Sequence, residues 1–431
     1  MLNRKPSAAA TIETMVISGN HSKNSVEKNT EHPIYQKNAD GAVRVSKLNI
    51  MTALSMPSEC GVKVRYDEFG GDIIWSKPNS EEWSLLNDNL SYDIALILES
   101  PAIGFPDIPT SKLSQAISSF ASRNPVDTLV AWVDTLKWDG IPRVEKFLTQ
   151  YLSCDDTPYI RSVSRYIWTG LAGRALKGGI KLDMVPVLVG SQGSGKSQIV
   201  KSIAPNPNYY TEIPLKVKDE DLSRLMRGKV IGELPELSGM RDRDVESIKA
   251  FITRTHERWI PKYKEYETSY ARRLLLIGTT NEDEILNDAT GARRWLPIKV
   301  GQCYPARVVA DRDQLWAEGA FLFLQTGIDW REAQALAPVQ HEKFRDTDSW
   351  EDPIREWLKR GHRRITMANA LEHGVKITTD RQTKSHQNRM GKVLVSLGCT
   401  KRSECNRRGW DVPPKLIQID GDNTELIGVP F

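Results

Sequence analysis

The eight residues from Gly190 to Ser197 could bind a nucleotide, because they read G-S-Q-G-S-G-K-S and fit the pattern G-x-x-x-x-G-K-[ST] of a phosphate-binding loop. In such a loop the glycines let the backbone close around a phosphate, and N–H groups at the start of the following helix point at its oxygens. Lys196 would then reach the β- and γ-phosphates, and Ser197 would hold Mg²⁺. The alternative is a glycine-rich turn without a nucleotide.

Two elements must position this loop. The apolar run from Val185 to Val189 stands directly before it and predicts a strand, and a helix is expected to begin near Lys196. ATP and Mg²⁺ are the expected cofactors. The expected nucleotide-binding residues are Gly190, Ser191, Gln192, Gly193, Ser194, Gly195, Lys196, Ser197 and Gln198.

Two acidic residues follow a second short run of β-forming residues, from Gly228 to Glu236. A carboxylate at the end of a strand beside the loop strand can hold Mg²⁺ or polarise the attacking water. Glu233 is the first choice for that site, and Glu236 is either its partner or the base itself. Phosphate-loop enzymes usually place Asp and Glu side by side, whereas this chain has Glu-Leu-Pro-Glu, so both assignments stay open. Two solvated glutamates at a surface strand end are the alternative.

A third run, from Arg273 to Asn281, is apolar without alternation and predicts a buried strand. Asn281 at its end could hold the hydrolytic water against the γ-phosphate, or it could simply form a turn. Farther on, Arg293 and Arg294 follow Gly291. An arginine inserted into a neighbouring subunit's site would stabilise the charge of the transition state. The alternative for this pair is a set of surface salt bridges.

These four features, in this order, resemble the virulence-associated protein E family, P-loop ATPases of phages and integrated elements that are related to superfamily 3 helicases. Three further segments are similar to the family. They are L-K-W-D-G-I-P-R at 136–143, D-A-T-G-A-R-R-W-L-P at 288–297, and R-D-Q-L-W-A-E at 312–318. The resemblance covers roughly residues 125 to 350.

The resemblance implies a hexameric, ring-forming, DNA-dependent ATPase that serves replication of a phage or mobile element in the cytoplasm of a bacterial host. A primase is fused upstream in some relatives. This chain has neither a Cys/His zinc pattern nor a paired-aspartate strand in that region, so we expect a helicase part with a separate primase as partner.

The composition limits the class of protein. With 431 residues, of which 39% are hydrophobic, the chain can bury cores in two or three domains. It has no apolar stretch of about 18 residues and no apolar signal region at the N-terminus, so no membrane association is expected. The five cysteines form no C-x-x-C pair, which argues against a zinc ribbon and a disulfide framework. The net charge of +4 does not by itself indicate a nucleic-acid partner.

The predicted fold class is α/β, with a P-loop ATPase core, a mainly helical N-terminal region and a C-terminal winged-helix-like domain. Helical spacing of apolar residues predicts helices over 111–122 and 159–176. The expected parts are a disordered tail at 1–42, the helical region at 43–182, the core at 183–328, a linker at 329–349 and the winged-helix-like domain at 350–431.

Within the core, cations that alternate with aromatic residues indicate a contact with single-stranded DNA, because lysine binds phosphate while rings stack on bases. A helix is expected over 245–255. In related ring helicases a hairpin before the asparagine strand lines the central pore, which would place Lys262 and Lys264 at its tip. A solvated basic loop is the alternative. The expected contact residues are Lys249, Arg258, Lys262 and Lys264, with Trp259, Tyr263 and Tyr266 as the aromatics.

The C-terminal stretch is strongly basic, since residues 355–408 contain 14 Lys and Arg against 4 Asp and Glu by direct count. Helices are expected over 350–360, 366–372 and 384–397, followed by a two-stranded wing over 400–412 with a turn at Arg408-Gly409. A third helix in the major groove would bind duplex DNA. A small helical cap with solvated cations is the alternative. The expected contact residues are Thr383, Lys384, Gln387, Asn388, Arg389, Arg407 and Arg408.

These features favour an ATP-dependent DNA helicase or translocase. An ATP-regulated DNA-binding initiator that does not unwind DNA is the main alternative, and a P-loop defence or signalling ATPase is the third.

Overall fold

The computed structural model describes residues 34–214, 216–237, 245–260, 266–281, 294–344, 349–404 and 407–417. The chain forms two compact units, one of residues 34–67 with 72–126, and one of residues 68–71 with the rest from 127 onward. The fold is mixed α/β, as the sequence predicted, and the largest sheet in the described ranges is parallel. No helix within the described ranges is long and apolar enough to cross a bilayer.

The N-terminal unit packs helices against a four-stranded sheet. Its core gathers apolar residues of the helices and of strand β1. The strands are β1 (Lys63–Asp67), β2 (Ile73–Ser76), β3 (Ser84–Leu85) and β4 (Pro125–Val126), in the order β3-β2-β1-β4. The helices are α1 (Lys47–Leu54), α2 (Pro57–Cys60), α3 (Asp88–Glu99) and α4 (Thr110–Arg123).

Helices contribute more residues than strands to residues 43–182, where the sequence predicted a mixed, mainly helical region. One expectation for this unit was wrong. The tail does not extend to residue 42. The ring of Tyr35 packs edge-on against Phe105 at 5.0 Å between centroids, and Asn49 Nδ2 donates to the carbonyl of Gln36 at 2.8 Å. Residues 1–33 lie outside the described part.

The second unit is built on a five-stranded sheet whose neighbouring strands are all parallel, in the order β11-β5-β10-β7-β6. Side chains alternate between two cores. In β10, for example, Leu275 and Ile277 face one core while Leu274, just before the strand, and Leu276 face the other. Burial on both faces explains the uninterrupted apolar runs. The strands are β5 (Val185–Val189), β6 (Tyr210–Glu212), β7 (Ile231–Pro235), β10 (Leu275–Thr280) and β11 (Trp295–Lys299).

This strand order corrects one expectation. The acidic strand β7 does not lie beside the loop strand β5, because the asparagine strand β10 pairs with both of them. Polar residues that follow β5, β10 and β7 therefore meet at one edge of the sheet, with those of β10 in the middle.

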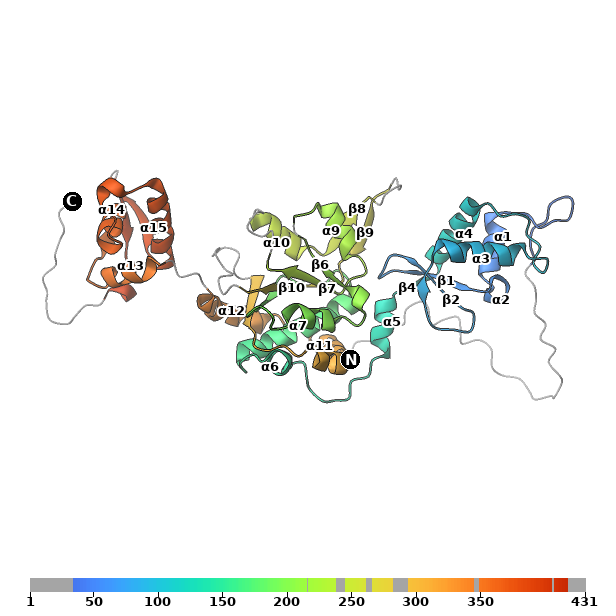
Figure 1. Cartoon of the computed structure of the whole chain (residues 1–431), viewed down its shortest axis with the longest axis horizontal. Coiled ribbons are helices and arrows are strands. Elements are labelled where there is room, and N and C mark those ends of the chain that lie inside the picture. Colours follow the sequence, from blue (N-terminus) through green and yellow to red (C-terminus); the bar gives the residue numbers. More distant parts are fainter. Residues whose placement is uncertain are drawn as a thin grey trace. The chain divides into compact units, whose positions relative to one another are not determined.

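Helices cover both faces of this sheet (Figure 1). On the first face lie α5 (Thr128–Thr135), α6 (Phe147–Leu152), α7 (Pro158–Leu176), α8 (Lys196–Ile203), α11 (Pro305–Thr326) and α12 (Arg331–Lys343). On the second lie α9 (Asp219–Met226) and α10 (Val245–Thr253). A hairpin of β8 (His256–Trp259) and β9 (Thr268–Ala271) precedes β10.

Two predicted boundaries of the core differ from the structure. The unit begins at residue 127 rather than 183, because the apolar faces of α5, α6 and α7 pack into the same core as the sheet. The predicted linker at 329–349 contains α12, whose Ala333 and Ala337 are buried one helical turn apart.

Two of the segments that resemble the family contact each other. Glu318 on α11 accepts hydrogen bonds from the backbone N–H groups of Arg143 and Val144, at 2.6 and 2.9 Å. Gln314, one turn earlier, accepts from the N–H of Asp139 at 2.9 Å. Helix α11 thus holds the W-D-G-I-P-R segment, which precedes α6 in the chain, through hydrogen bonds to the backbone of that segment.

The residues after 349 pack around a core of their own. They form α13 (Glu351–Leu358), α14 (Met367–Asn369), a π-helical turn (Ala370–Gly374) and α15 (Lys384–Ser396). The sheet is three-stranded, in the order β12-β14-β13, with β12 (Arg364–Ile365), β13 (Thr400–Glu404) and β14 (Arg407–Asp411).

The predicted two-stranded wing with a turn at Arg408-Gly409 was wrong in detail. Both residues lie inside β14, where Gly409 pairs with Arg402, and Trp410 is buried between β12 and β13.

Candidate active site

The glycine loop follows β5 and leads into α8. Gly193 and Gly195 have φ values of 82° and 90°, in the region that side chains rarely adopt. A Cβ on Gly190 would lie 2.9 Å from the carbonyl oxygen of Val300, so glycine is required there for packing against the residue that follows β11. The sequence prediction of a strand, a loop and a helix is confirmed, since β5 ends at Val189 and α8 begins at Lys196.

Lys196 is held inside this loop. It is 7% exposed, and its Nζ donates to the carbonyl oxygens of Gly190 and Ser191 at 2.8 and 2.9 Å. The third acceptor is Oδ1 of Asn281, at 2.7 Å. The ammonium group thus lies where the loop meets the end of β10.

Asn281 connects Lys196 to an acid. Its Nδ2 donates to Oε1 of Glu236 at 3.1 Å. Glu236 is exposed and has a φ of +48°, and Leu237 after it has a φ of +44°. Non-glycine residues rarely adopt this conformation, and such strain is common at functional sites. The glutamate is therefore turned back toward the asparagine immediately after β7.

Glu233 lies in the middle of β7 and is fully buried. Three hydroxyl groups donate to its carboxylate. Ser197 and Thr279 donate to Oε1 at 2.6 and 2.8 Å, and Tyr210 on β6 donates to Oε2. Burial, followed by the bond to Glu233, raises the pKa of Tyr210, so its hydroxyl stays protonated and remains a donor. This carboxylate is thereby fixed beside the serine of the glycine loop.

The loop fits a phosphate group. Helix α8 has no side-chain cap at its N-terminus, so the first N–H groups of the helix are not bonded by a capping side chain. The hydroxyl of Ser194 is buried and has no hydrogen-bond partner among the residues that the structure describes. Unsatisfied donors around a glycine cradle are the arrangement that binds phosphate oxygens.

Arg294 lies away from this group of residues. Arg294 directly precedes Trp295, which pairs with Val185 at the start of the parallel strands β11 and β5. It is therefore at the edge of the sheet opposite to Lys196. Its Nε is buried without a hydrogen-bond partner in the described ranges. Arg293 lies outside the described residues.

The hairpin before β10 is present where the sequence suggested one, but its tip is outside the described residues, and with it Lys262 and Lys264. Arg258 is exposed and Lys249 is partly buried. Trp259 does not present a free ring, because it packs edge-on against Tyr270 at 5.4 Å between centroids.

The predicted contact residues of α15 are exposed at Lys384, Gln387 and Asn388. The hydroxyl of Thr383 accepts from the N–H of His386 at 3.3 Å and so caps the helix. Arg389 donates to Ser349 Oγ at 2.9 Å, and its guanidinium lies 4.2 Å from the centroid of Trp350. Arg407 and Arg408 belong to β14 by their backbone, and their side chains are outside the described part.

A comparison with models of protein families identifies a domain in the chain. Residues 133–346 match the model of the virulence-associated protein E-like domain. This part of the chain is a virulence-associated protein E-like domain. The match runs from α5 to just beyond α12, so it includes the whole five-stranded sheet and the glycine loop. It confirms the resemblance that the sequence indicated over roughly 125–350.

Two similar solved structures are fragments of one protein. "The A form apo structure of NrS-1 C terminal region-CTR" has 13% identity and a TM-score of 0.49, over 84% of this chain and 98% of that one. "The apo structure of NrS-1 C terminal region" has 12% identity and a TM-score of 0.47, with the same two coverages. These TM-scores are too low to support an argument about function. No curated protein matches the chain.

In this virulence-associated protein E-like domain, sequence reasoning missed three residues of the site. Tyr210 stands on a short strand without a recognisable pattern, and Thr279 is hidden in an apolar run. Cys303 donates its N–H to the carbonyl of Ser194 at 3.0 Å and so supports the loop from outside. Only Thr279 could have been found from the sequence. It stands two residues before Asn281, and side chains two positions apart on a strand point to the same face of the sheet.

Proposed function

We propose that this chain is an ATP-dependent DNA helicase or translocase that works as a hexameric ring in replication of a phage or mobile element. The observation that carries the proposal is the set of side chains at the carboxyl edge of the sheet. Lys196, Asn281 and Glu236 are joined by hydrogen bonds of 2.7 and 3.1 Å, and Ser197 is bonded to the buried Glu233 at 2.6 Å.

The two glutamates have different surroundings, which supports a division of their roles. Glu233 is buried and bonded to the loop serine, so it would hold Mg²⁺ together with Ser197. Glu236 is exposed beside Asn281, so it is the better candidate for the base that takes a proton from water.

The chain's own residues would then act as follows. Lys196 would exchange its contacts with the loop carbonyls for phosphate oxygens, and the first N–H groups of α8 would bind them as well. Asn281 would orient water toward Glu236. Bound Mg²⁺ would neutralise phosphate charge in the transition state.

The place of Arg294 supports assembly into a ring. A strand of five residues is about 16 Å long, so an arginine at its start does not reach the phosphate site at its end. Arg293 or Arg294 would therefore act at the site of a neighbouring subunit, as an arginine finger does. A closed ring of identical subunits gives each site one such arginine.

DNA contacts are proposed at two places. Single-stranded DNA would meet the β8–β9 hairpin, with Arg258 exposed on it and Lys262 and Lys264 toward its tip. Duplex DNA would meet the C-terminal domain, whose three helical segments and small sheet suit a winged-helix-like fold with α15 as the recognition helix. A primase would be a separate partner.

Strand displacement on forked DNA of both polarities, together with sizing of the protein with and without ATP, tests the proposal. Helicase function predicts DNA-stimulated hydrolysis, displacement at one polarity and a ring in the presence of ATP. Binding and hydrolysis without displacement at either polarity would instead support an initiator that does not unwind DNA. A monomer under all conditions would contradict the shared site.

A further inference from the structure

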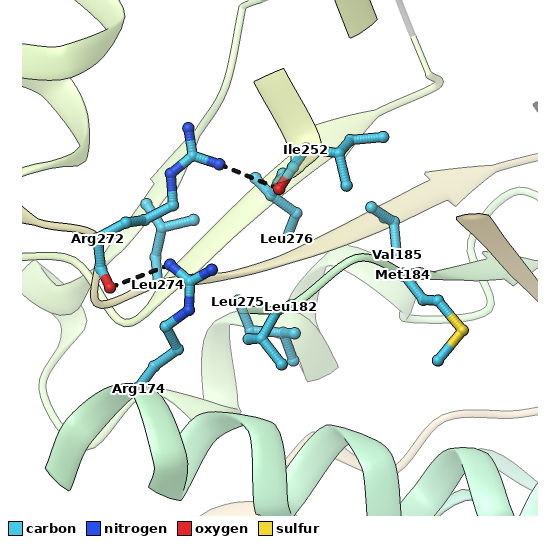
Figure 2. Close-up of a pocket in the computed structure, with 9 residues that line it drawn as sticks. All are labelled: Arg174, Leu182, Met184, Val185, Ile252, Arg272, Leu274, Leu275 and Leu276. Atoms are coloured by element: carbon cyan, nitrogen blue, oxygen red, sulfur yellow. Dashed lines mark hydrogen bonds between the residues drawn. The ribbon is translucent and has the colours of Figure 1, made fainter. Parts of the chain in front are cut away.

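Two buried arginines line a small cavity at the start of β5 and β10. Arg174 comes from the last turn of α7, and Arg272 from the segment between the hairpin and β10. Both are 1% exposed. Figure 2 shows the two side chains with seven others, all of them Leu, Ile, Val or Met, around the cavity. Two cations thus face an apolar space at the amino ends of the parallel strands, whereas the glycine loop lies at their carboxyl ends.

Only one carboxylate is in contact with this pair among the described residues. Glu257 on β8 is fully buried and accepts from Arg272 Nε at 2.6 Å. The same carboxylate also accepts from Arg254 Nη1 at 3.2 Å and from Ser223 Oγ at 3.0 Å. It is therefore already shared between two guanidinium groups.

Arg174 has no carboxylate in contact within the described ranges. Its Nη1 donates to the carbonyl oxygen of Arg272 at 3.0 Å, and its Nε is buried without a hydrogen-bond partner in that part of the chain. Burial lowers the pKa of Arg174 to about 10, which still leaves the group charged at neutral pH. A buried cation that lacks an opposite charge is strongly destabilising.

The cavity limits what can balance this charge. It has room for about one water-sized particle. A water molecule would satisfy the free N–H but would not balance the charge, whereas a small monovalent anion would do both. We propose that Arg174, with Arg272, binds a monovalent anion of the size of chloride in this cavity.

Such an anion would join two parts of the fold. It would connect α7 to the segment that carries the hairpin into β10, and so would strengthen the base of the hairpin. An anion that binds only the folded state stabilises it in proportion to the logarithm of its concentration above the dissociation constant. The site does not depend on ATP, so its test is separate from that of the proposed function.

The first experiment is crystallographic. Crystals of the wild-type protein grown or soaked in potassium bromide should show an anomalous peak within hydrogen-bonding reach of the Arg174 guanidinium. A cavity that holds only water, or no peak there at all, would overturn the proposal.

The second experiment is thermal unfolding in potassium chloride and in potassium methanesulfonate, whose anion is larger than chloride. Chloride should raise the Tm of the wild type relative to methanesulfonate, by roughly 2–4 °C per tenfold increase above its Kd. Arg174→Met should remove this difference. The matched control is Arg161→Met on the same helix, whose guanidinium pairs with Asp156 at the surface and which should keep the difference.

Equal Tm values of the wild type in the two salts, or a chloride effect that persists in Arg174→Met, would show that the site is not an anion site. Should Arg174→Met fail to fold, the bromide crystals and the wild-type salt comparison still decide.

Discussion

Lys196 Nζ on α8 and Asn281 Oδ1 after β10 are 2.7 Å apart, and the amide nitrogen of the same asparagine donates to Glu236. A lysine can only donate and a carboxylate can only accept, so a primary amide is suited to bridge them because it does both. A cation, a neutral amide and an anion thus stand in line at the carboxyl edge of the sheet. Substitutions of Lys196, Asn281 and Glu236 should therefore have different effects.

Glu236→Gln and Glu233→Gln should separate the proposed base from the proposed metal ligand. The amide that replaces the first carboxylate would keep an acceptor for Asn281 but could not take a proton, so we expect kcat to fall by about 10²–10⁴ with the Mg²⁺ requirement unchanged. Glu233→Gln should raise the Mg²⁺ concentration needed for half-maximal activity. Titrations of ATP hydrolysis with Mg²⁺ measure both effects. The same Mg²⁺ shift in both variants would contradict the assignment.

Tyr210→Phe should raise the Mg²⁺ concentration needed for half-maximal hydrolysis. The tyrosine hydroxyl donates to Glu233, the proposed metal ligand. Without it the carboxylate would be held less firmly beside Ser197, so a titration of ATP hydrolysis with Mg²⁺ should show weaker Mg²⁺ binding. The control is Tyr159→Phe, whose hydroxyl bonds the carbonyl of Pro297 away from the glutamate.

The same variant predicts a change in stability at high pH. The pKa of Tyr210 is raised above its value in the unfolded chain, chiefly by burial. The stability that comes with the protonated hydroxyl is therefore present below about pH 10 and is lost as the pH rises beyond that. The free energy of unfolding in urea, measured from about pH 9 to about pH 11, should fall more steeply with pH for the wild type than for Tyr210→Phe. An identical pH dependence of unfolding in the two proteins would show that this hydroxyl is not held as described.

The elements of the site were predictable because their signals are local. Strand β5, the start of α8 and the end of β10 lie where the apolar runs and the glycines indicated, since strands buried on both faces carry uninterrupted apolar residues. Their order was not predictable. Which strand lies between β5 and β7 depends on connections that sequence patterns do not encode.

The role of Tyr210 and the boundary at residue 127 depend on tertiary contacts. A hydroxyl on a three-residue edge strand has no period or motif, and only the sheet order brings it to Glu233. The apolar face of α7 has the same spacing whether it covers its own sheet or that of another unit, so helical periodicity alone could not assign it.

Arg294→Ala and Lys196→Ala should distinguish a shared site from a structural arginine. Loss of a finger in trans should leave ATP binding nearly normal and lower turnover by roughly 10³ or more. Lys196→Ala should remove hydrolysis with the fold intact, because this side chain bonds polar atoms of the loop and Asn281. Mixing the two inactive proteins should restore part of the activity, since some interfaces then combine an intact lysine with an intact arginine. The control for the arginine is Arg161→Ala, a surface ion pair with Asp156. No recovery on mixing, with normal ring formation, would exclude Arg294 as the finger.

The two proposed DNA surfaces should fail in different ways. Replacing Lys262 and Lys264 by Ala should remove DNA stimulation and unwinding while basal hydrolysis and duplex binding survive, because the hairpin is proposed to grip the translocated strand. Replacing Lys384, Gln387 and Asn388 by Ala should weaken duplex binding and reduce the salt slope by roughly one unit for each lost phosphate contact. Arg389 is left in place, because it bonds Ser349 and stacks on Trp350 within the domain.

Unwinding from a preformed fork separates the two cases, since a fork supplies the single strand that the core needs without selection of a duplex site. The α15 variant should therefore unwind a preformed fork nearly as well as the wild type, while the hairpin variant should not. Both variants are to be measured on duplex and forked DNA over a salt series, with Lys181→Ala, an exposed lysine paired with Asp183, as the control for the loss of a surface charge. Identical defects in the two variants would contradict separate roles for the two DNA surfaces. If neither variant has a defect, both basic stretches are solvated surface, and the DNA path must lie elsewhere on the ring.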